Sequence, residues 1–232
     1  MKKLFFAAAF LLLTSSLFAQ DVLLKQDVAA DSVKTKFGPN RSHYRHFYVG
    51  YGLIIGEPDK AGSAVNYGSN TFTIGFRFKQ KVCNLYSVGF NIAYTSYTYR
   101  LKQDSNKTVP NSMLHDKEHL SINTVGVGLY NRFNFGRRGD RIGKFVDLGV
   151  HADWVFGGKH FTSDKQDNGN IIETTIKRLK YFNNYQYGAF VNIGFNRYVF
   201  TAVYRLSDLF EKSYTYSELP RLTVGIQIGF HK

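Results

Sequence analysis

The segment Arg221-Leu-Thr-Val-Gly-Ile-Gln-Ile-Gly-Phe230 decides the fold class. From Leu222 to Phe230 its even-numbered residues are all apolar, and the odd-numbered residues between them are threonine, glycine or glutamine. Because successive side chains of a β-strand point to opposite faces, this alternation predicts a strand with one apolar and one polar face. The strands that pair with it should show the same pattern.

Seven further segments of the chain show this alternation of apolar and polar residues. Their apolar faces consist almost wholly of Val, Ile, Leu, Phe and Tyr, whereas the other faces combine Gly, Thr and Asn with charges such as Arg77 and Asp147. Transmembrane β-barrels have this distribution, apolar toward lipid and polar within. Glycines on the inner face leave room in a narrow lumen for large side chains from opposite strands. The clear segments are residues 72–78, 86–94, 145–156 and 185–195 (interrupted by Phe190), and the weaker ones are residues 47–55, 123–135 and 198–206.

The lengths of the connections separate a membrane barrel from a soluble β-sandwich, which could also alternate. Long and short connections alternate along the chain, as expected of barrels with long outer loops and short periplasmic turns. We therefore predict an all-β, eight-stranded antiparallel transmembrane up-and-down β-barrel over residues 46–231. The long connections are residues 57–69, 102–117, 159–176 and 208–220, and the short ones are residues 80–84, 136–144 and 196–197.

The N-terminus indicates export. Lys2 and Lys3 precede an uninterrupted apolar stretch at residues 4–13, and a cleavage site follows at Ala19. This pattern predicts a signal peptide over residues 1–19, because the apolar stretch is too short to span a bilayer. Residues 20–45 are polar and are expected to form a flexible periplasmic leader. We expect the mature protein in the outer membrane of a Gram-negative bacterium.

The charge of the mature chain bears on its partners. Without Lys2 and Lys3, 28 basic and 17 acidic residues give a net charge of +11. Export argues against nucleic acid, so this balance points to anionic lipid or an acidic partner. The single cysteine, Cys83, excludes an internal disulfide.

The predicted signal peptide, eight alternating strands and closing segment 221–230 together resemble the outer-membrane β-barrel domain common in Bacteroidota, including PorT-like proteins. The resemblance covers about residues 45–230. It implies the barrel fold and the outer membrane, and PorT-like members are tied to a secretion system for gliding and virulence proteins. The last strand also resembles the signal read by the barrel-assembly machinery, although His231 and Lys232 follow its aromatic residue.

Six charged residues are expected inside the barrel. Buried charges must be paired, and the mixed signs allow a network that plugs the lumen. The catalytic alternative follows lipid A deacylases, which place a His and a Ser two residues apart; here Ala152 and Asp153 follow His151 instead. The predicted lumen network comprises Arg77, Arg132, Asp147, His151, Asp153 and Arg205.

The stretch from His115 to His119 matches the H-x-x-E-H spacing of one metalloprotease class. That chemistry needs both histidines on one face of a helix. On an extended chain they lie about 13 Å apart, so a shared metal ion is not expected. We predict neither a metal nor a cofactor.

Two surfaces are candidates for binding. A basic periplasmic rim could bind anionic headgroups or an acidic periplasmic protein, or could consist of ordinary solvated charges. It comprises Lys79, Lys81, Arg137, Arg138, Arg141, Lys144 and Arg197. At the other end, Tyr94, Tyr97 and Tyr99 form a predicted outer aromatic surface, either the interfacial girdle of any such barrel or a binding surface.

These features predict a non-enzymatic outer-membrane barrel with a side-chain-filled lumen. Its role would be structural or interactive, including accessory work in a secretion or envelope-assembly complex. Expected partners are outer-membrane lipids, including lipopolysaccharide, and outer-membrane or periplasmic proteins. A narrow small-solute channel and a membrane-embedded lipid-modifying hydrolase are the alternatives.

Overall fold

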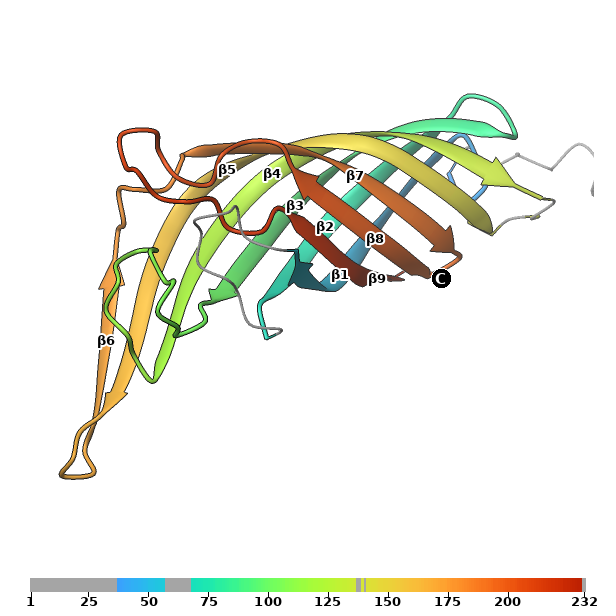
Figure 1. The fold of residues 1–232 in the computed structure, drawn as a ribbon. Helices are drawn as coiled ribbons and strands as arrows, with labels where there is room; N and C mark the ends of the chain where they lie inside the picture. Colours follow the sequence, from blue (N-terminus) through green and yellow to red (C-terminus); the bar gives the residue numbers. More distant parts are fainter. Residues whose placement is uncertain (1–36, 57–67, 137–138, 140, 231–232) are drawn as a thin grey trace, which may run out of the picture. The chain divides into compact units, whose positions relative to one another are not determined.

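The computed structural model describes residues 37–56, 68–136, 139 and 141–230. These residues form one antiparallel sheet of nine strands (Figure 1). No helix in this part of the chain is long and apolar enough to cross a membrane. The strands are β1 (His43–Ile55), β2 (Asn70–Lys81), β3 (Tyr86–Arg100), β4 (Lys117–Phe135), β5 (Lys144–Lys165), β6 (Ile171–Lys177), β7 (Tyr185–Phe195), β8 (Tyr198–Arg205) and β9 (Leu222–Phe230).

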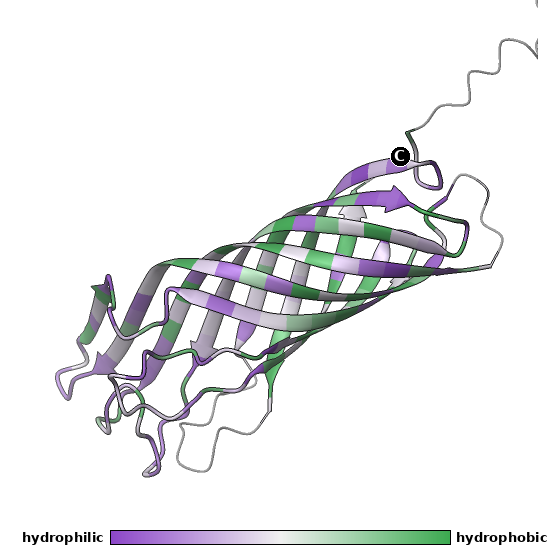
Figure 2. Ribbon diagram, turned by 90° about the horizontal axis from the view of Figure 1, so that it is seen from above, coloured by the Kyte–Doolittle hydropathy of each residue, from purple (hydrophilic) through white to green (hydrophobic). Residues whose placement is uncertain are grey.

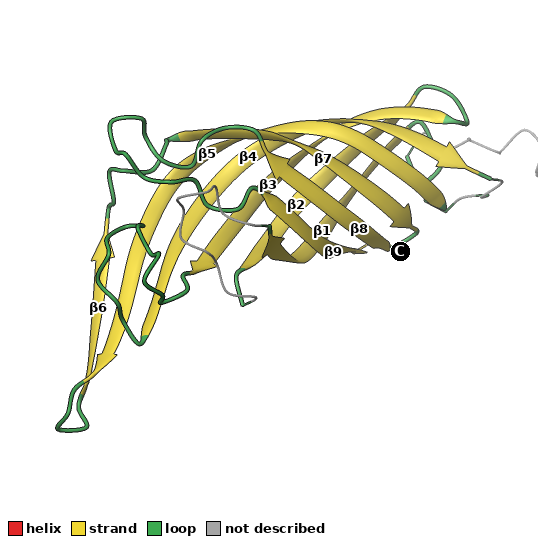
Figure 3. Ribbon diagram, in the orientation of Figure 1, coloured by secondary structure: helices red, strands yellow, loops and turns green. Residues whose placement is uncertain are grey.

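Eight of these strands close into a ring. Sequence neighbours pair with one another, except that β5 pairs with β7, and β1 pairs with β9 to close the barrel. β6 lies outside the ring and pairs only with the far end of β5. Figure 3 shows this barrel of strands joined by loops alone. The predicted eight-stranded up-and-down β-barrel is therefore confirmed.

The two faces of each strand differ as the alternation predicts. Along β4, Leu129 is 61% exposed on the outer face, whereas its neighbour Tyr130 and the arginine Arg132 are buried inside. Apolar and polar residues accordingly alternate along the strands in Figure 2. The outer face of the barrel thus carries the exposed apolar side chains that a lipid-facing surface requires.

The wall of the barrel is uneven in height. β4 and β5 pair all the way from Lys117 to Phe135, whereas β8 and β9 pair only from Tyr198 to Tyr204 on the β8 side. Residues 159–176, predicted as a loop, instead form the end of β5, a turn and β6. This hairpin extends beyond the other strands (Figure 1). The register between β4 and β5 shifts between Asn123 and Thr124, and the Phe156 residue opposite this step has no pairing partner. Phe156 therefore forms a β-bulge, which changes the face to which the later residues of β5 point.

The barrel boundaries differ slightly from the prediction. β1 begins at His43 rather than near residue 46, and β9 ends at Phe230. The predicted signal peptide, most of the predicted leader and residues 57–67 of the first long connection lie outside the described residues. The short-turn end comprises residues 82–85 and 196–197 and the described residues 136, 139 and 141–143. The long-loop end comprises residues 56, 68–69, 101–116, 178–184 and 206–221.

Candidate functional site

The lumen is filled by large side chains lying over glycines. Phe190 on β7 lies over Gly149, its register partner on β5, and a Cβ atom at Gly149 would come within 2.4 Å of the Phe190 ring. Phe145 lies in the same way over its partner Gly194. The predicted role of the glycines is therefore correct, but the side chains they accommodate come from the directly paired strand rather than from opposite strands. Tyr48 over Gly75 and Tyr130 over Gly89 repeat the arrangement.

An ion pair lies within this packing, against the Phe145 ring near the short-turn end of the barrel. Arg132 on β4 donates from Nε and Nη2 to the two carboxylate oxygens of Asp147 on β5, at 2.6 and 2.9 Å. The Arg132 guanidinium also lies 3.5 Å from the centroid of the Phe145 ring. Both charged side chains are almost wholly buried. Such a pair fixes geometry, because either partner alone would be an uncompensated buried charge.

The other predicted lumen charges form separate contacts. Arg77 donates to Oε1 of Gln227 at 2.7 Å and lies over the Tyr48 ring. His151 Nδ1 lies 2.8 Å from Asp153 Oδ2 on the same strand face. These contacts and the Arg132–Asp147 pair are separate, so the predicted charges do not form one connected network, although Arg77, His151 and Asp153 line the same small cavity.

Between these contacts lies a cavity of about 80 Å³, lined mainly by threonine, asparagine and tyrosine side chains. It has room for a few water molecules.

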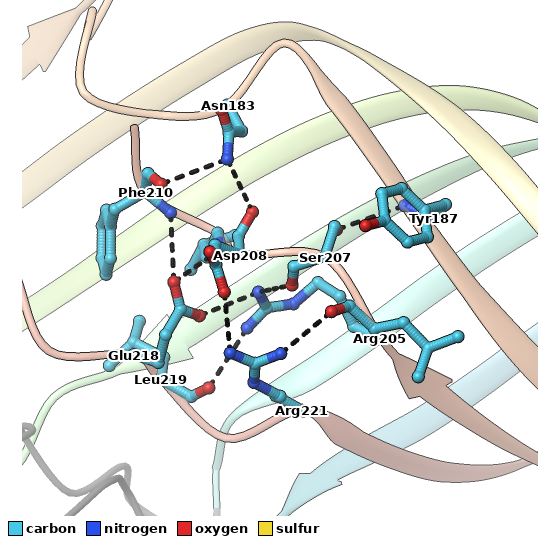
Figure 4. Close-up of polar contacts among 11 residues, drawn as sticks. Asn183, Tyr187, Arg205, Ser207, Asp208, Phe210, Glu218, Leu219 and Arg221 are labelled. Atoms are coloured by element: carbon cyan, nitrogen blue, oxygen red, sulfur yellow. Dashed lines mark hydrogen bonds and ion pairs between the residues drawn. The ribbon is translucent and has the colours of Figure 1, made fainter. Parts of the chain in front are cut away.

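Arg205 does not join the lumen charges but belongs to the long-loop end (Figure 4). Its Nη1 donates to Glu218 Oε2 at 2.9 Å, and its Nη2 donates to the carbonyl of Leu219 at 3.1 Å. The other oxygen of Glu218 accepts hydrogen bonds from the backbone amides of Leu209 and Phe210. Arg205 and Glu218 therefore hold residues 206–221 folded over the barrel.

A hydrophobic cap, which the sequence analysis missed, closes the long-loop end. Leu209 and Val109 come from two different loops and are completely buried, as are Leu120 and Ile122 of β4. The sequence contains a signal of this cap, because apolar and aromatic residues recur in the predicted loops, where a solvated loop would not need them. The remaining members of the cap are Ile54, Tyr99, Leu101, Val155, Phe182, Phe210 and Leu219.

A buried carboxylate anchors a second loop of this cap. Glu118, at the start of β4, contacts Lys107 at 2.5 Å, His160 at 2.7 Å and Gln103 at 2.8 Å. Burial alone raises the pKa of Glu118, but hydrogen bonds from His160, Lys107 and Gln103 outweigh it and hold that pKa below its ordinary value. Glu118 is thus an ionised anchor joining residues 101–116 to β4 and β5.

The short-turn end has a smaller plug. Tyr44, Ile142, Phe145 and Val199 form a buried cluster there. Lys79, predicted on the exposed rim, is instead buried, and its ammonium group donates to the carbonyl of Pro39.

The other rim residues that the structure describes make separate contacts or are exposed. Lys81 donates to the backbone and side-chain oxygens of Asn40 at 3.2 and 3.3 Å. Arg141, Lys144 and Arg197 are exposed, and Lys144 lies over the Phe195 ring. Arg137 and Arg138 lie outside the described residues.

The three tyrosines of the predicted outer aromatic surface lie in different places in the structure. Tyr94 lies on the outer face beside Phe156, with 6.1 Å between ring centroids. Tyr99 is buried in the cap and Tyr97 packs against it, so the prediction that they form an outer surface is wrong. Odd and even positions of a strand face opposite sides, so the spacing of Tyr94 and Tyr97 carried this information. The exposed aromatic group here consists of Tyr94, Trp154, Phe156 and Tyr185.

The two histidines of the H-x-x-E-H motif are engaged separately. His115 Nδ1 lies 2.7 Å from Asp164, and the His119 ring stacks on Phe161. No group of three or more metal-ligating side chains occurs among the described residues.

Comparisons with known proteins add little to this description. No protein-family model and no curated protein sequence matches the chain. Among solved structures, the chain is similar to Ail, the attachment invasion locus protein of Yersinia pestis, solved in complex with the heparin analogue sucrose octasulfate. That similarity has 14% sequence identity and a TM-score of 0.33, and it covers 80% of this chain and 97% of Ail.

Proposed function

We propose that this protein is a non-enzymatic outer-membrane β-barrel with a closed lumen, which acts as a structural and interaction element. The observation that carries the proposal is closure at both ends of the lumen, with the Arg132–Asp147 pair packed on Phe145 of the cluster at the short-turn end. The apolar cap lies at the long-loop end, the Arg132–Asp147 layer lies inside, and the Tyr44 cluster lies at the short-turn end. A barrel of eight strands is only wide enough to be filled by side chains. Its function then resides in its surfaces and its neighbours.

The surface best suited to interaction is the β5–β6 hairpin. Every residue of β6 is exposed, and its outer edge is unpaired, because β6 contacts only β5 among the strands. With the long loops on the cell surface, as barrel topology expects, the hairpin would project outward. The resemblance to PorT-like proteins extends the proposal to accessory work in a secretion or envelope-assembly complex.

Neither alternative has equal support. The lumen cavity of about 80 Å³ is far smaller than the several hundred Å³ of usual ligand pockets, so it could not admit a lipid substrate. A small-solute channel would need a continuous path through the apolar cap and the Arg132 layer.

Reconstitution in planar bilayers tests the closed lumen. We expect the purified protein to give no steady single-channel current under conditions in which a general porin conducts. A reproducible current of defined amplitude would overturn the proposal in favour of a channel. Cross-linking in cells, with the complete chain and a variant lacking the hairpin tip, tests the interaction role; loss of a cross-linked partner in the variant alone is the expected result.

A further inference from the structure

A basic groove lies at the base of the β5–β6 hairpin. It has a volume of about 480 Å³, and its cations are Lys159, Lys177, Arg178 and Lys180. All four side chains are exposed, and none of the described residues that line the groove is acidic. None of the four forms an ion pair with another described residue. The rest of the lining comprises Val155, Phe156, Gly157, Gly158, Leu179, Phe182 and Asn184.

The fold brings these cations together at a cost. Lys159 of β5 and Lys177 of β6 are direct register partners in the antiparallel pair. Like charges placed directly opposite each other in a sheet are destabilising. The chain then turns at Arg178, whose φ of 59° lies in the left-handed region, and adds Lys180 to the same groove. An anion bound between the strands would relieve this repulsion.

The height of the groove relative to the membrane indicates which class of anion it would bind. Phe156 belongs both to the groove and to the exposed aromatic group that includes Trp154, 54% exposed, and Tyr185, 74% exposed. Exposed aromatic residues of this kind mark the membrane–water interface of barrels. Lys159 follows Phe156 by three residues, or about 10 Å along an extended strand. The cations would therefore lie at the height of lipid headgroups.

We propose that this groove binds the phosphorylated headgroup of a glycolipid in the outer leaflet. Phosphate oxygens would accept charge-assisted hydrogen bonds from the four cations, and the acyl chains would lie along the aromatic and apolar outer wall below. This inference rests on the proposed location in the outer membrane. It assigns the lipid partner expected from the sequence to a defined site, at the end of the barrel opposite the predicted basic rim.

The chain supplies its own reporter for a test. Trp154 is the single tryptophan of the protein and lies on β5, five residues before Lys159. The folded protein in neutral detergent would be titrated with bisphosphorylated lipid A while Trp154 fluorescence is followed. The test variant carries K159Q, K177Q, R178Q and K180Q. The control carries R141Q, K165Q, R197Q and K212Q, which removes the same charge from exposed positions outside the groove.

We expect saturable binding that weakens at least tenfold in the test variant and changes less than twofold in the control. Dephosphorylated lipid A should bind at least tenfold more weakly than the bisphosphorylated form. Equal affinity of both variants would overturn the site. Saturation by inorganic phosphate alone, at the same concentrations and with the same spectral change, would overturn the glycolipid assignment in favour of a free anion.

A separate observation distinguishes failure of the proposed function. Heat-modifiable gel mobility and co-fractionation with outer membranes report whether the protein is an inserted barrel, independently of the groove. If both hold and the titration fails, only the glycolipid site is wrong. If the protein does not fractionate with outer membranes, the proposed function fails first.

Discussion

At the scale of single residues, the packing of the barrel interior depends on a few side-chain contacts that no neighbouring residue can replace. Arg132 and Asp147 neutralise each other in a buried space against the Phe145 ring. Gly149 and Gly194 leave space for rings of the adjacent strand. The buried ion pair and the packing of rings on glycines therefore share one layer of the interior. A substitution in either should change the stability of the whole barrel.

Removal of one charge tests the ion pair. D147N leaves the Arg132 guanidinium buried without its counter-charge, so we expect a loss of about 3–5 kcal/mol in the free energy of unfolding. Urea titration in lipid vesicles, followed by Trp154 fluorescence, measures it. D167N, at an exposed position in the hairpin turn, is the matched control and should change stability by less than about 0.5 kcal/mol. A loss below about 1 kcal/mol for D147N would contradict the assigned role of the pair.

Alanine at a lumen glycine tests the ring packing. In G149A the new Cβ atom would meet the Phe190 ring at 2.4 Å and the backbone oxygen of Leu129 at 2.5 Å, so we expect a loss of about 1–3 kcal/mol in unfolding free energy. G157A on the same strand is the control, because its Cβ atom would lie 3.6 Å from the nearest side-chain atom. Parallel urea titrations compare the two variants. Equal stabilities would show that the lumen has more freedom than the structure indicates.

At the scale of elements, β5 shows where a local pattern stops being informative. Its alternation over residues 145–156 predicts the strand within the barrel wall. The bulge at Phe156 then reverses the faces, so Lys159 points outward while His160 reaches Glu118 inside the cap. A pattern with a fixed period of two cannot anticipate that reversal. The exposed strand β6 was missed because none of its residues is buried, which leaves its polar and apolar residues without a consistent face.

Shortening the hairpin tests its independence from the barrel. Replacing residues 165–171 with Asn-Gly keeps the pair Asp164–Ile172 and supplies a two-residue turn. We expect the barrel to retain its heat-modifiable mobility and its unfolding free energy within about 0.5 kcal/mol, because the removed residues are exposed. Loss of the folded barrel would show that the hairpin supports the wall instead of extending from it.

The anchoring of residues 101–116 should depend on pH. The folded state lowers the pKa of Glu118, so its stabilising effect is complete above the unfolded value of about 4.3 and is lost as pH falls through the lower folded value. We expect an acid-active protease such as pepsin to cut residues 101–116 increasingly as pH drops from 5 toward 2. Relative to cleavage of an unfolded substrate at the same pH, which corrects for the pH dependence of pepsin itself, E118Q should be cut at a rate that varies much less over this range. E173Q, on exposed β6, should behave as the original chain, and an identical profile for E118Q would contradict the anchor.

At the scale of the whole molecule, the sequence predicts the barrel better than its closure. Period-two alternation and the rhythm of long and short connections are local, and they predict the eight-stranded ring. The cap is assembled from Val109, Phe182 and Leu209, which lie in three loops far apart in the sequence. No local pattern records that they meet. Arg205 was grouped with the lumen charges for the same reason, because its partner Glu218 lies in the following loop.

The uneven height of the wall has a mechanical consequence. β8 and β9 share the shortest strand pairing in the ring, whereas β4 and β5 share the longest. A force applied to the C-terminus would therefore detach β9 first, breaking its pairings with β8 and β1 while the β4–β5 side of the wall stays intact. The barrel would then unravel from its C-terminal strand as a sequence of unequal steps. The largest resistance is expected where β4 and β5 run together, before the pairs among β1, β2, β3 and β4 separate.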